Sequence, residues 1–266
     1  MRLTHQLKRA ARKSVLYAAE PVDAAVRVLN GKRGYPPIAL RRQNGPLGTF
    51  ERTAGEYVAY LVTLADLAPH DHILDVGCGS GAMPLMLKER LADSGRYTGF
   101  EVDRPSLAWC QKHLANSQYR FFHHDYWNAT YNPAGTRLLP WPLEDNTVDV
   151  ILLKSIFTHM LPDDVAFYLS EIARVLTPGR KGLVTAFLYD NDDEAMNGRH
   201  SFPHRGDGYR FSNPASPESA IALSAPAFRD AVASVGLKVE ELPGLWRLDQ
   251  SRRPYAYQDM VVLTKM

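Results

Sequence analysis

The chain has 266 residues, of which 45% are hydrophobic, and its formal net charge is only +2. A chain of this length can bury one large core, and its nearly balanced charge argues against a general nucleic-acid binder. No apolar run reaches the roughly 18 residues that a membrane-spanning helix needs. The two cysteines, Cys78 and Cys110, indicate neither a disulfide framework nor a closely spaced metal site, so a reducing cytoplasm is the expected location.

Basic charge is concentrated at the N-terminus. Residues 1–42 contain ten Lys or Arg but only two acids, Glu20 and Asp23. Apolar residues among them follow helical spacing, which is typical either of a helix on an anionic surface such as a membrane or of a solvated cap. The stretch that follows is rich in Gly and Pro and predicts a loop. We therefore expect a basic helical arm and loop over residues 1–48, ahead of a main domain over residues 49–266.

Within the main domain, helical and strand patterns alternate, which predicts a parallel sheet with helices on both faces. Two final strands with an irregular connection predict an antiparallel pair at the C-terminal edge. The expected fold is α/β, a Rossmann-like doubly wound and mostly parallel seven-stranded sheet. Helices are predicted over 54–67, 83–95, 105–117 and 162–179, and strands over 72–76, 96–103, 119–125, 147–155, 181–189, 237–248 and 257–265.

The stretch "HILDVGCGSGAMPLML", residues 72–87, joins the first strand to a helix through Gly77, Gly79 and Gly81. In such sheets, ligands bind beyond the carboxyl ends of the strands. The glycines let the backbone turn sharply and approach a ligand closely. Their spacing also satisfies the dinucleotide pattern G-x-G-x-x-(G/A), so the loop by itself leaves the cofactor open.

Three acidic residues at successive strand ends narrow the choice of cofactor. Asp75 precedes the glycines and suits an amino group better than a pyrophosphate, which it would repel. Glu101 ends the second strand and can accept hydrogen bonds from two ribose hydroxyls. Asp125 ends the third strand and can accept one from an adenine amino group. Each could be a strand-end or capping residue, but three in register favour a ligand with these groups.

The segments "LDVGCGSG", "GFEVD", "HHDY" and "DVILLKSIFTHMLPDDVAFYLSEIARVLTPG" resemble the class I S-adenosylmethionine-dependent methyltransferases over about residues 69–190. The resemblance implies S-adenosylmethionine as the cofactor. It implies a methionine end against Asp75, Gly77, Cys78, Gly79 and Gly81, a ribose against Glu101 and Val102, an adenine against Asp125 and Tyr126, and a floor below the methyl group at Lys154 and Ser155.

Methyl transfer to a hydroxyl often uses a base, and His159, which follows the fourth strand in "SIFTHM", is the leading candidate. The alternative is that His159 packs or caps the next helix. Tyr189 and Asp190 are second-rank candidates. No metal is expected, because His123 and His124 point to opposite sides of a strand and no spacing resembles a metal triad.

The expected function is methyl transfer to a hydroxyl of a sugar, glycan or polar secondary metabolite. The stretch 191–225 is long and polar and is predicted to be irregular, as substrate-covering insertions tend to be, and its His200, His204, Arg205 and Tyr209 are candidate contacts or surface residues. The alternatives are an N- or other small-molecule methyltransferase, a nicotinamide-dependent oxidoreductase, or a non-catalytic cofactor-binding scaffold. The sequence leaves the acceptor and the oligomeric state open.

Overall fold

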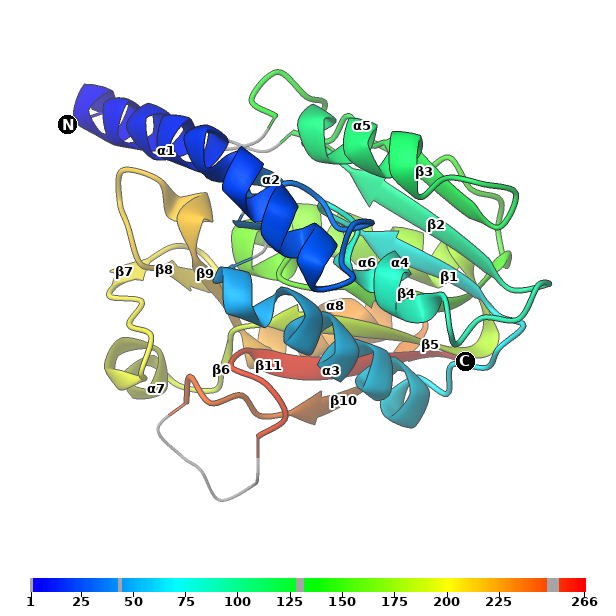
Figure 1. The fold of residues 1–266 in the computed structure, drawn as a ribbon. Coiled ribbons are helices and arrows are strands. Elements are labelled where there is room, and N and C mark those ends of the chain that lie inside the picture. The colour runs from blue at the N-terminus through cyan, green and yellow to red at the C-terminus, as the bar shows by residue number, and fades with distance from the viewer. Residues whose placement is uncertain (1, 43–44, 128–131, 248–253) are drawn as a thin grey trace.

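A computed structural model describes residues 2–42, 45–127, 132–247 and 254–266, with side chains from residue 14 onward. Its centre is a seven-stranded sheet of order β10-β11-β5-β4-β1-β2-β3 (Figure 1). The strands are β1 (His72–Val76), β2 (Arg96–Glu101), β3 (Tyr119–His123), β4 (Val148–Leu153), β5 (Leu176–Ala186), β10 (Leu237–Leu242) and β11 (Asp259–Lys265).

The five strands β1 to β5 run parallel to one another, as predicted. Strand β11 is antiparallel to both β5 and β10 and lies between them, so the antiparallel strand is one position in from the edge. The mostly parallel α/β sheet with its C-terminal antiparallel pair is thereby confirmed. Parallel strands need crossover connections, and the helices that make them cover both faces of the sheet.

Each face of the sheet has its own core. The helices α3 (Phe50–Leu64), α4 (Ala82–Leu87) and α5 (Arg104–His113) pack on one face. The helices α6 (Pro162–Val175) and α8 (Ala225–Ser234) pack on the other. Side chains of β4 alternate between the two: Val150 and Leu152 belong to the first core, and Ile151 and Leu153 to the second. Burial on both faces explains why this strand is continuously apolar from Val150 to Leu153.

Helix α6 ends at Val175, four residues before the predicted end at Gly179, and β5 begins at Leu176. The backbone before a proline is biased away from the helical region, and Pro178 therefore favours the extended conformation here. The pairing of β4 with β5 shifts register: Val148 pairs with Leu176 and Val150 with Lys181. The shift accommodates the extra residues of β5 that lie ahead of its buried half.

The insertion at 191–225 contains more regular structure than its polar sequence predicts. It begins after β6 (Leu188–Tyr189) and contains α7 (Asp192–Asn197), and its short strands join β6 in a second sheet of order β6-β9-β8-β7. Strands of two to four residues are too short to produce a detectable alternation, so the prediction of an irregular segment was wrong here. The remaining elements are β7 (His204–Arg205), β8 (Tyr209–Phe211), η4 (Pro217–Ser219) and β9 (Ile221–Ser224).

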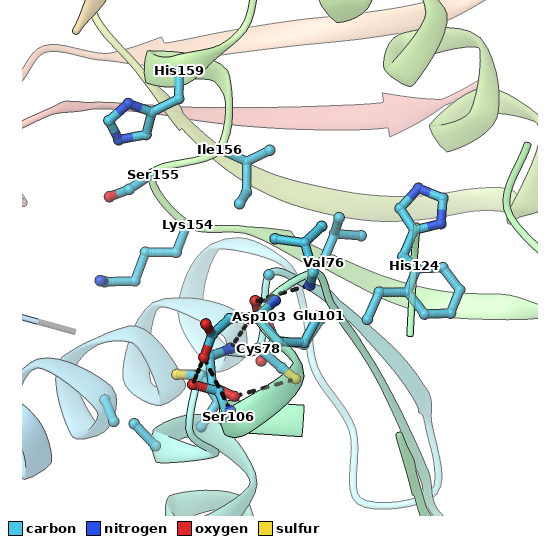
Figure 2. A pocket seen from close by; sticks show the side chains of 18 of the residues that line it. Val76, Cys78, Glu101, Asp103, Ser106, His124, Lys154, Ser155, Ile156 and His159 are labelled. Atoms are coloured by element: carbon cyan, nitrogen blue, oxygen red, sulfur yellow. Dashed lines mark hydrogen bonds between the residues drawn. The ribbon is translucent and has the colours of Figure 1, made fainter. Parts of the chain in front are cut away.

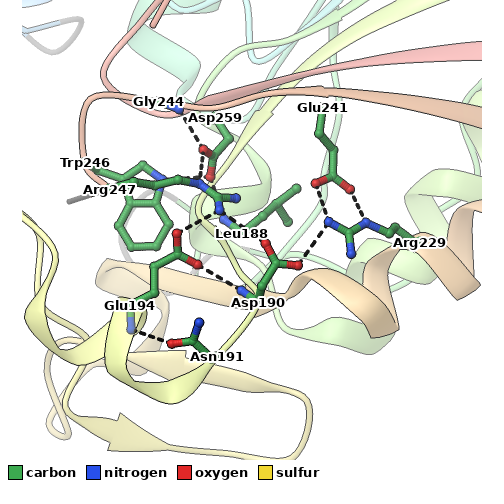
Figure 3. Close-up of polar contacts among 10 residues, drawn as sticks. All are labelled: Leu188, Asp190, Asn191, Glu194, Arg229, Glu241, Gly244, Trp246, Arg247 and Asp259. Carbon is green, nitrogen blue, oxygen red and sulfur yellow. Dashed lines mark hydrogen bonds and ion pairs between the residues drawn. The ribbon is translucent and has the colours of Figure 1, made fainter. Parts of the chain in front are cut away.

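The buried carboxylate of Asp259, at the start of β11, joins β6 and the segment from Gly244 to Arg247 to the main sheet (Figure 3). Asp259 accepts hydrogen bonds from the backbone N–H of Leu188 at 2.8 Å and from that of Gly244 at 2.8 Å. The indole N–H of Trp246 donates to it at 2.7 Å and the guanidinium of Arg247 at 2.8 Å. A buried charge is stable only when it is paired and hydrogen-bonded, and four donors meet that condition.

In the described part of the chain, the helical elements ahead of α3 include α1 (Arg2–Leu29), α2 (Ile38–Arg41) and η2 (Leu47–Thr49). The predicted N-terminal helix is therefore present, and its first turns extend past the body of the molecule in Figure 1. The predicted domain boundary at residue 48 stays a prediction. Among the described helices, none combines the length and the apolar character that crossing a membrane requires.

Candidate functional site

A cavity of about 420 Å³ opens at the carboxyl ends of β1, β2 and β4, the edge at which open α/β sheets bind ligands. Ten of the predicted site residues line it, and Gly81, Asp125, Tyr189 and Asp190 are outside its lining. Figure 2 shows Lys154, Ser155 and His159 grouped after β4, with Cys78, Glu101 and Asp103 at the ends of β1 and β2. The ten are Asp75, Gly77, Cys78, Gly79, Glu101, Val102, Tyr126, Lys154, Ser155 and His159.

The glycine loop follows the wall of this cavity in a left-handed backbone conformation. Gly77 has φ 81° and Gly79 φ 56°. A Cβ on Gly77 would lie 2.4 Å from Cδ1 of Ile156, so both conformation and space require glycine. Gly81, with φ 82°, has a packing role instead: a Cβ there would lie 2.5 Å from Cδ1 of Leu114. Its predicted contact with the methionine end stays a prediction.

Glu101 is buried at the end of β2 and is held by three backbone amides. Its carboxylate accepts from the N–H of Gly79 at 2.6 Å, of Val102 at 2.9 Å and of Asp103 at 2.7 Å. Burial raises the pKa of Glu101 to about 7, although the three amides act in the opposite direction. The glycine loop and the carboxylate thus fix each other's position.

A second buried carboxylate, Asp75, lies at the end of β1. The hydroxyl of Tyr97 donates to it at 2.6 Å. Burial raises the pKa of Asp75 to about 6, while the hydrogen bond and the charge of Lys154 oppose the shift. Burial lowers the pKa of Lys154, whose Nζ lies 5.4 Å from the ring centroid of Tyr57.

Ser155 occupies a strained position in the cavity wall. Its φ of 57° lies in the left-handed region, which costs energy for a residue other than glycine. Its N–H donates to the hydroxyl of Thr185 at 2.7 Å, and its own hydroxyl donates to the side-chain oxygen of Gln258 at 3.1 Å. Strain that the surroundings hold in place is typical of a ligand-binding segment.

An aromatic wall follows β3. His124 is buried, with its ring centroid 5.4 Å from that of Phe100 and 6.1 Å from that of Tyr126, both in stacked geometry. Burial lowers the pKa of His124 to about 4, so the ring is neutral, and among the described residues its Nε2 has no hydrogen-bond partner. Asp125 points elsewhere: it is 51% exposed and accepts from Asn132 at 2.9 Å. Its predicted adenine contact stays a prediction.

His159 closes the 3-10 turn η3 (Phe157–His159) and lines the cavity. Its Nδ1 lies 2.9 Å from the backbone carbonyl oxygen of Glu218. A carbonyl can only accept, so Nδ1 carries the proton in this hydrogen bond, and Nε2 is the acceptor of the neutral ring. The geometry therefore gives His159 a fixed tautomer with a basic nitrogen.

The other candidate bases lie away from the cavity. Asp190 pairs with Arg229 at 3.1 Å and with Arg247 at 3.4 Å, at the junction in Figure 3. Tyr189 belongs to the small sheet through β6. Since neither lines the cavity, their roles as bases stay predictions without a contact in support.

The four candidate contact residues of the insertion also lie outside the cavity lining. They are His200, His204, Arg205 and Tyr209. The ring of His200 stacks on that of Phe202, with centroids 4.6 Å apart, and the ring of His204 on that of Phe211 at 5.3 Å. Arg205 pairs with Asp192 at 3.4 Å, and Tyr209 packs against the core below the small sheet.

Several lining residues were not predicted as site residues. They come from α3 and the segment before it, from the start of α5, from the end of β3 and from α6, and they enter the cavity because the fold brings these elements to one edge. In the described residues, no group of three or more His, Cys, Asp or Glu is placed to hold a metal ion. The lining residues that the sequence did not identify include Gly45, Thr49, Phe50, Thr53, Asp103, Ser106, His124 and Tyr168.

The cavity residues Asp75, Glu101, His124 and Tyr126 fit S-adenosylmethionine. Ionised carboxylates are costly to bury unless opposite charge or donors accompany them. The ammonium and sulfonium of this molecule would supply positive charge for Asp75, and its ribose hydroxyls would supply donors for Glu101. The stacked rings of His124 and Tyr126, both in the cavity lining, would offer a flat wall to an adenine.

Residues 74–184 match a family model described as a methyltransferase domain. The demethylmenaquinone methyltransferase of Symbiobacterium thermophilum is 30% identical over 132 residues, which make up 50% of this chain and 47% of that protein. The chain therefore spans about half the length of this curated relative.

Two solved structures share the fold. A SAM-dependent methyltransferase from Aquifex aeolicus has a TM-score of 0.52 at 16% identity, over 84% of this chain and 95% of that one. A chain of the Haloferax volcanii complex with the Trm112 methyltransferase activator has a TM-score of 0.54 at 16% identity, over 82% and 92%. At this identity the likeness concerns the fold.

Proposed function

We propose that this chain is a class I S-adenosylmethionine-dependent methyltransferase, in agreement with the methyltransferase-domain match over residues 74–184, and that it transfers a methyl group from this cofactor to a hydroxyl of a small molecule. The observation that carries the proposal is the single cavity wall shared by Glu101, Asp75 and His159. It brings acceptors suited to the cofactor and a basic nitrogen to the same space.

Residues of this chain would hold the cofactor at three places. Asp75 and the loop from Gly77 to Gly79 would contact the methionine end, Glu101 the ribose, and the wall of His124 and Tyr126 the adenine. When bound, S-adenosylmethionine supplies an electrophilic methyl group together with its own leaving group. The task left to the protein is to position the acceptor and to manage its proton.

His159 is the group best placed for that proton. Its Nδ1–H is engaged by the carbonyl of Glu218, which leaves Nε2 as the acceptor. An acceptor hydroxyl that reaches Nε2 becomes a better nucleophile as its proton moves to the imidazole. Tyr189 and Asp190 remain weaker candidates, because other elements engage them away from the cavity.

The most specific part of the proposal is the chemical class of the methyl acceptor. A sugar, glycan or polar metabolite agrees with the hydroxyl chemistry, but the polar residues of the insertion do not line the cavity. A second candidate is a hydroxylated aromatic ring methylated at carbon, as the name of the Symbiobacterium relative suggests. The aromatic and apolar lining, including Phe50, Met160 and Tyr168, favours a ring of this kind.

The test is transfer of an isotopically labelled methyl group to a panel of sugars, glycans, polar metabolites and quinols. Label on an oxygen of the product supports the first candidate, and label on a ring carbon supports the second. If the cofactor binds but no member of the panel is labelled, and extracts of cells give no labelled product either, the non-catalytic scaffold becomes the better hypothesis.

A further inference from the structure

The C-terminal half of α1 turns its polar side toward its own domain. The guanidinium of Arg27 donates to Asp23 at 2.7 Å and also pairs with Glu20. Arg41, at the end of α2, pairs with Asp23. The backbone N–H of Ile38 donates to Glu20 at 2.9 Å. The contact that holds this helix in place is therefore made of ion pairs and hydrogen bonds.

The apolar side of the same helix points outward. Val15, Val22, Val26 and Leu29 are 67%, 70%, 49% and 85% exposed. Their spacing of seven, four and three residues places them on one stripe along the helix. We call these four residues the α1 stripe. In the sequence, Leu3, Leu7 and Ala11 continue the same spacing toward the N-terminus. A surface helix ordinarily has the opposite orientation, with its apolar side against the core.

The charge of this region identifies what covers the stripe. Residues 1–42 hold ten Lys or Arg against Glu20 and Asp23, and both acids are already engaged by Arg27 and Arg41. The excess positive charge has no matching acid within the segment. A second copy packed along the same stripe would bring two strongly positive arms together, which costs energy. An anionic surface would neutralise them.

We propose that α1 lies in the surface of an anionic lipid bilayer, with the α1 stripe in the boundary between headgroups and acyl chains. The polar side of α1 keeps the ion pairs of Asp23 and Glu20 with Arg27 and Arg41, and these hold α1 against α2. Basic residues of the arm attract the anionic headgroups over short range. Apolar burial and electrostatic attraction act together, as in other interfacial helices.

Co-sedimentation of the full chain with vesicles tests this. One set of vesicles is phosphatidylcholine alone, and the other contains about a third phosphatidylglycerol. The protein should sediment with the anionic vesicles, and at least about tenfold less at high salt, because screening weakens the attraction. Val22→Glu and Leu29→Glu should each weaken the binding by about tenfold or more, since a charge replaces an inserted apolar group.

Val62→Glu is the matched control. Val62 is 37% exposed on α3, away from the stripe, and its variant should bind vesicles as the unchanged protein does. Thermal unfolding and cofactor titration should confirm that all three variants fold and keep the cavity. Equal vesicle binding by the protein and its stripe variants, or no sedimentation with anionic vesicles, would overturn the proposal. So would a dimer in sedimentation velocity that Val22→Glu dissociates, which would make a second copy the occupant.

Discussion

Nδ1 of His159 lies 2.9 Å from the backbone carbonyl oxygen of Glu218, and this contact joins the segment after β4 to the insertion before β9. A distant part of the chain thus selects the tautomer of the proposed base. Because Nδ1 holds its proton against a carbonyl, the basic nitrogen is Nε2. The insertion therefore contributes to the site through this backbone contact, although its predicted polar side chains lie elsewhere.

Replacing His159 separates a chemical role from a packing role. A general base contributes about 10²- to 10⁴-fold, so His159→Ala should lower turnover by that factor and leave cofactor affinity nearly unchanged. Initial rates with labelled cofactor and calorimetric titration measure the two effects. His113→Ala is the control, since His113 is exposed on α5. A stable His159→Ala protein with near-native turnover would remove His159 from the mechanism.

The two buried carboxylates predict how cofactor binding depends on pH. In the free protein the pKa of Glu101 is raised to about 7 and that of Asp75 to about 6. The ionised forms accept hydrogen bonds from the ribose and attract positive charge, so affinity should increase as the pH rises through these values and then level off. From Glu101 alone, affinity at pH 5.5 should be roughly 30-fold below that at pH 8.5.

Titration of the protein with S-adenosylmethionine across this pH range measures the dependence. Glu101→Ala should bind more weakly at every pH and lose most of the slope above about pH 7, where Asp75 is mostly ionised. An affinity that is constant from pH 5.5 to pH 8.5 would show that neither carboxylate contacts the bound cofactor.

Gly77 and Gly55 form a matched pair for testing the loop. At Gly77, with φ 81°, a Cβ would meet Ile156 Cδ1 at 2.4 Å. Gly77→Ala should therefore lower the free energy of unfolding by about 1–3 kcal/mol and weaken cofactor binding. At Gly55, in α3, a Cβ would meet nothing within 4 Å, so Gly55→Ala should add about 1 kcal/mol. Urea unfolding compares them, and an unchanged midpoint for Gly77→Ala would refute the constraint.

The central sheet could be predicted because its strands are strongly patterned. Burial on both faces gives β1 and β4 apolar cores, Ile73 and Leu74 in β1 and residues 150–153 in β4, and the glycines after β1 mark the ligand edge. The second sheet was not predicted, because β6 and β7 have only two residues each and such short strands show no sequence pattern. Their conformation depends on pairing with neighbours rather than on their own sequence.

The site was only partly predictable for a related reason. Alternation along a strand predicts that His124 and Asp125 point to opposite sides, but it does not say which side holds the cavity. The structure places His124 inside and Asp125 outside. Phe50 and Thr53 enter the cavity from α3, which is distant from the motifs in sequence. A local sequence pattern cannot predict this contact with the cavity, because only the packing of α3 against the sheet creates it.

The most direct test of the cofactor site is calorimetric titration of the full chain and of its Glu101→Ala variant with S-adenosylmethionine at about pH 8. The protein should bind one equivalent, and the variant should bind about 10- to 150-fold more weakly, the equivalent of 1.5–3 kcal/mol for a charge-assisted hydrogen bond. Unfolding curves of the two proteins should show that both are folded. Equal affinity of the two proteins for S-adenosylmethionine, or tight binding of a nicotinamide dinucleotide in its place, would contradict the assignment of this cavity.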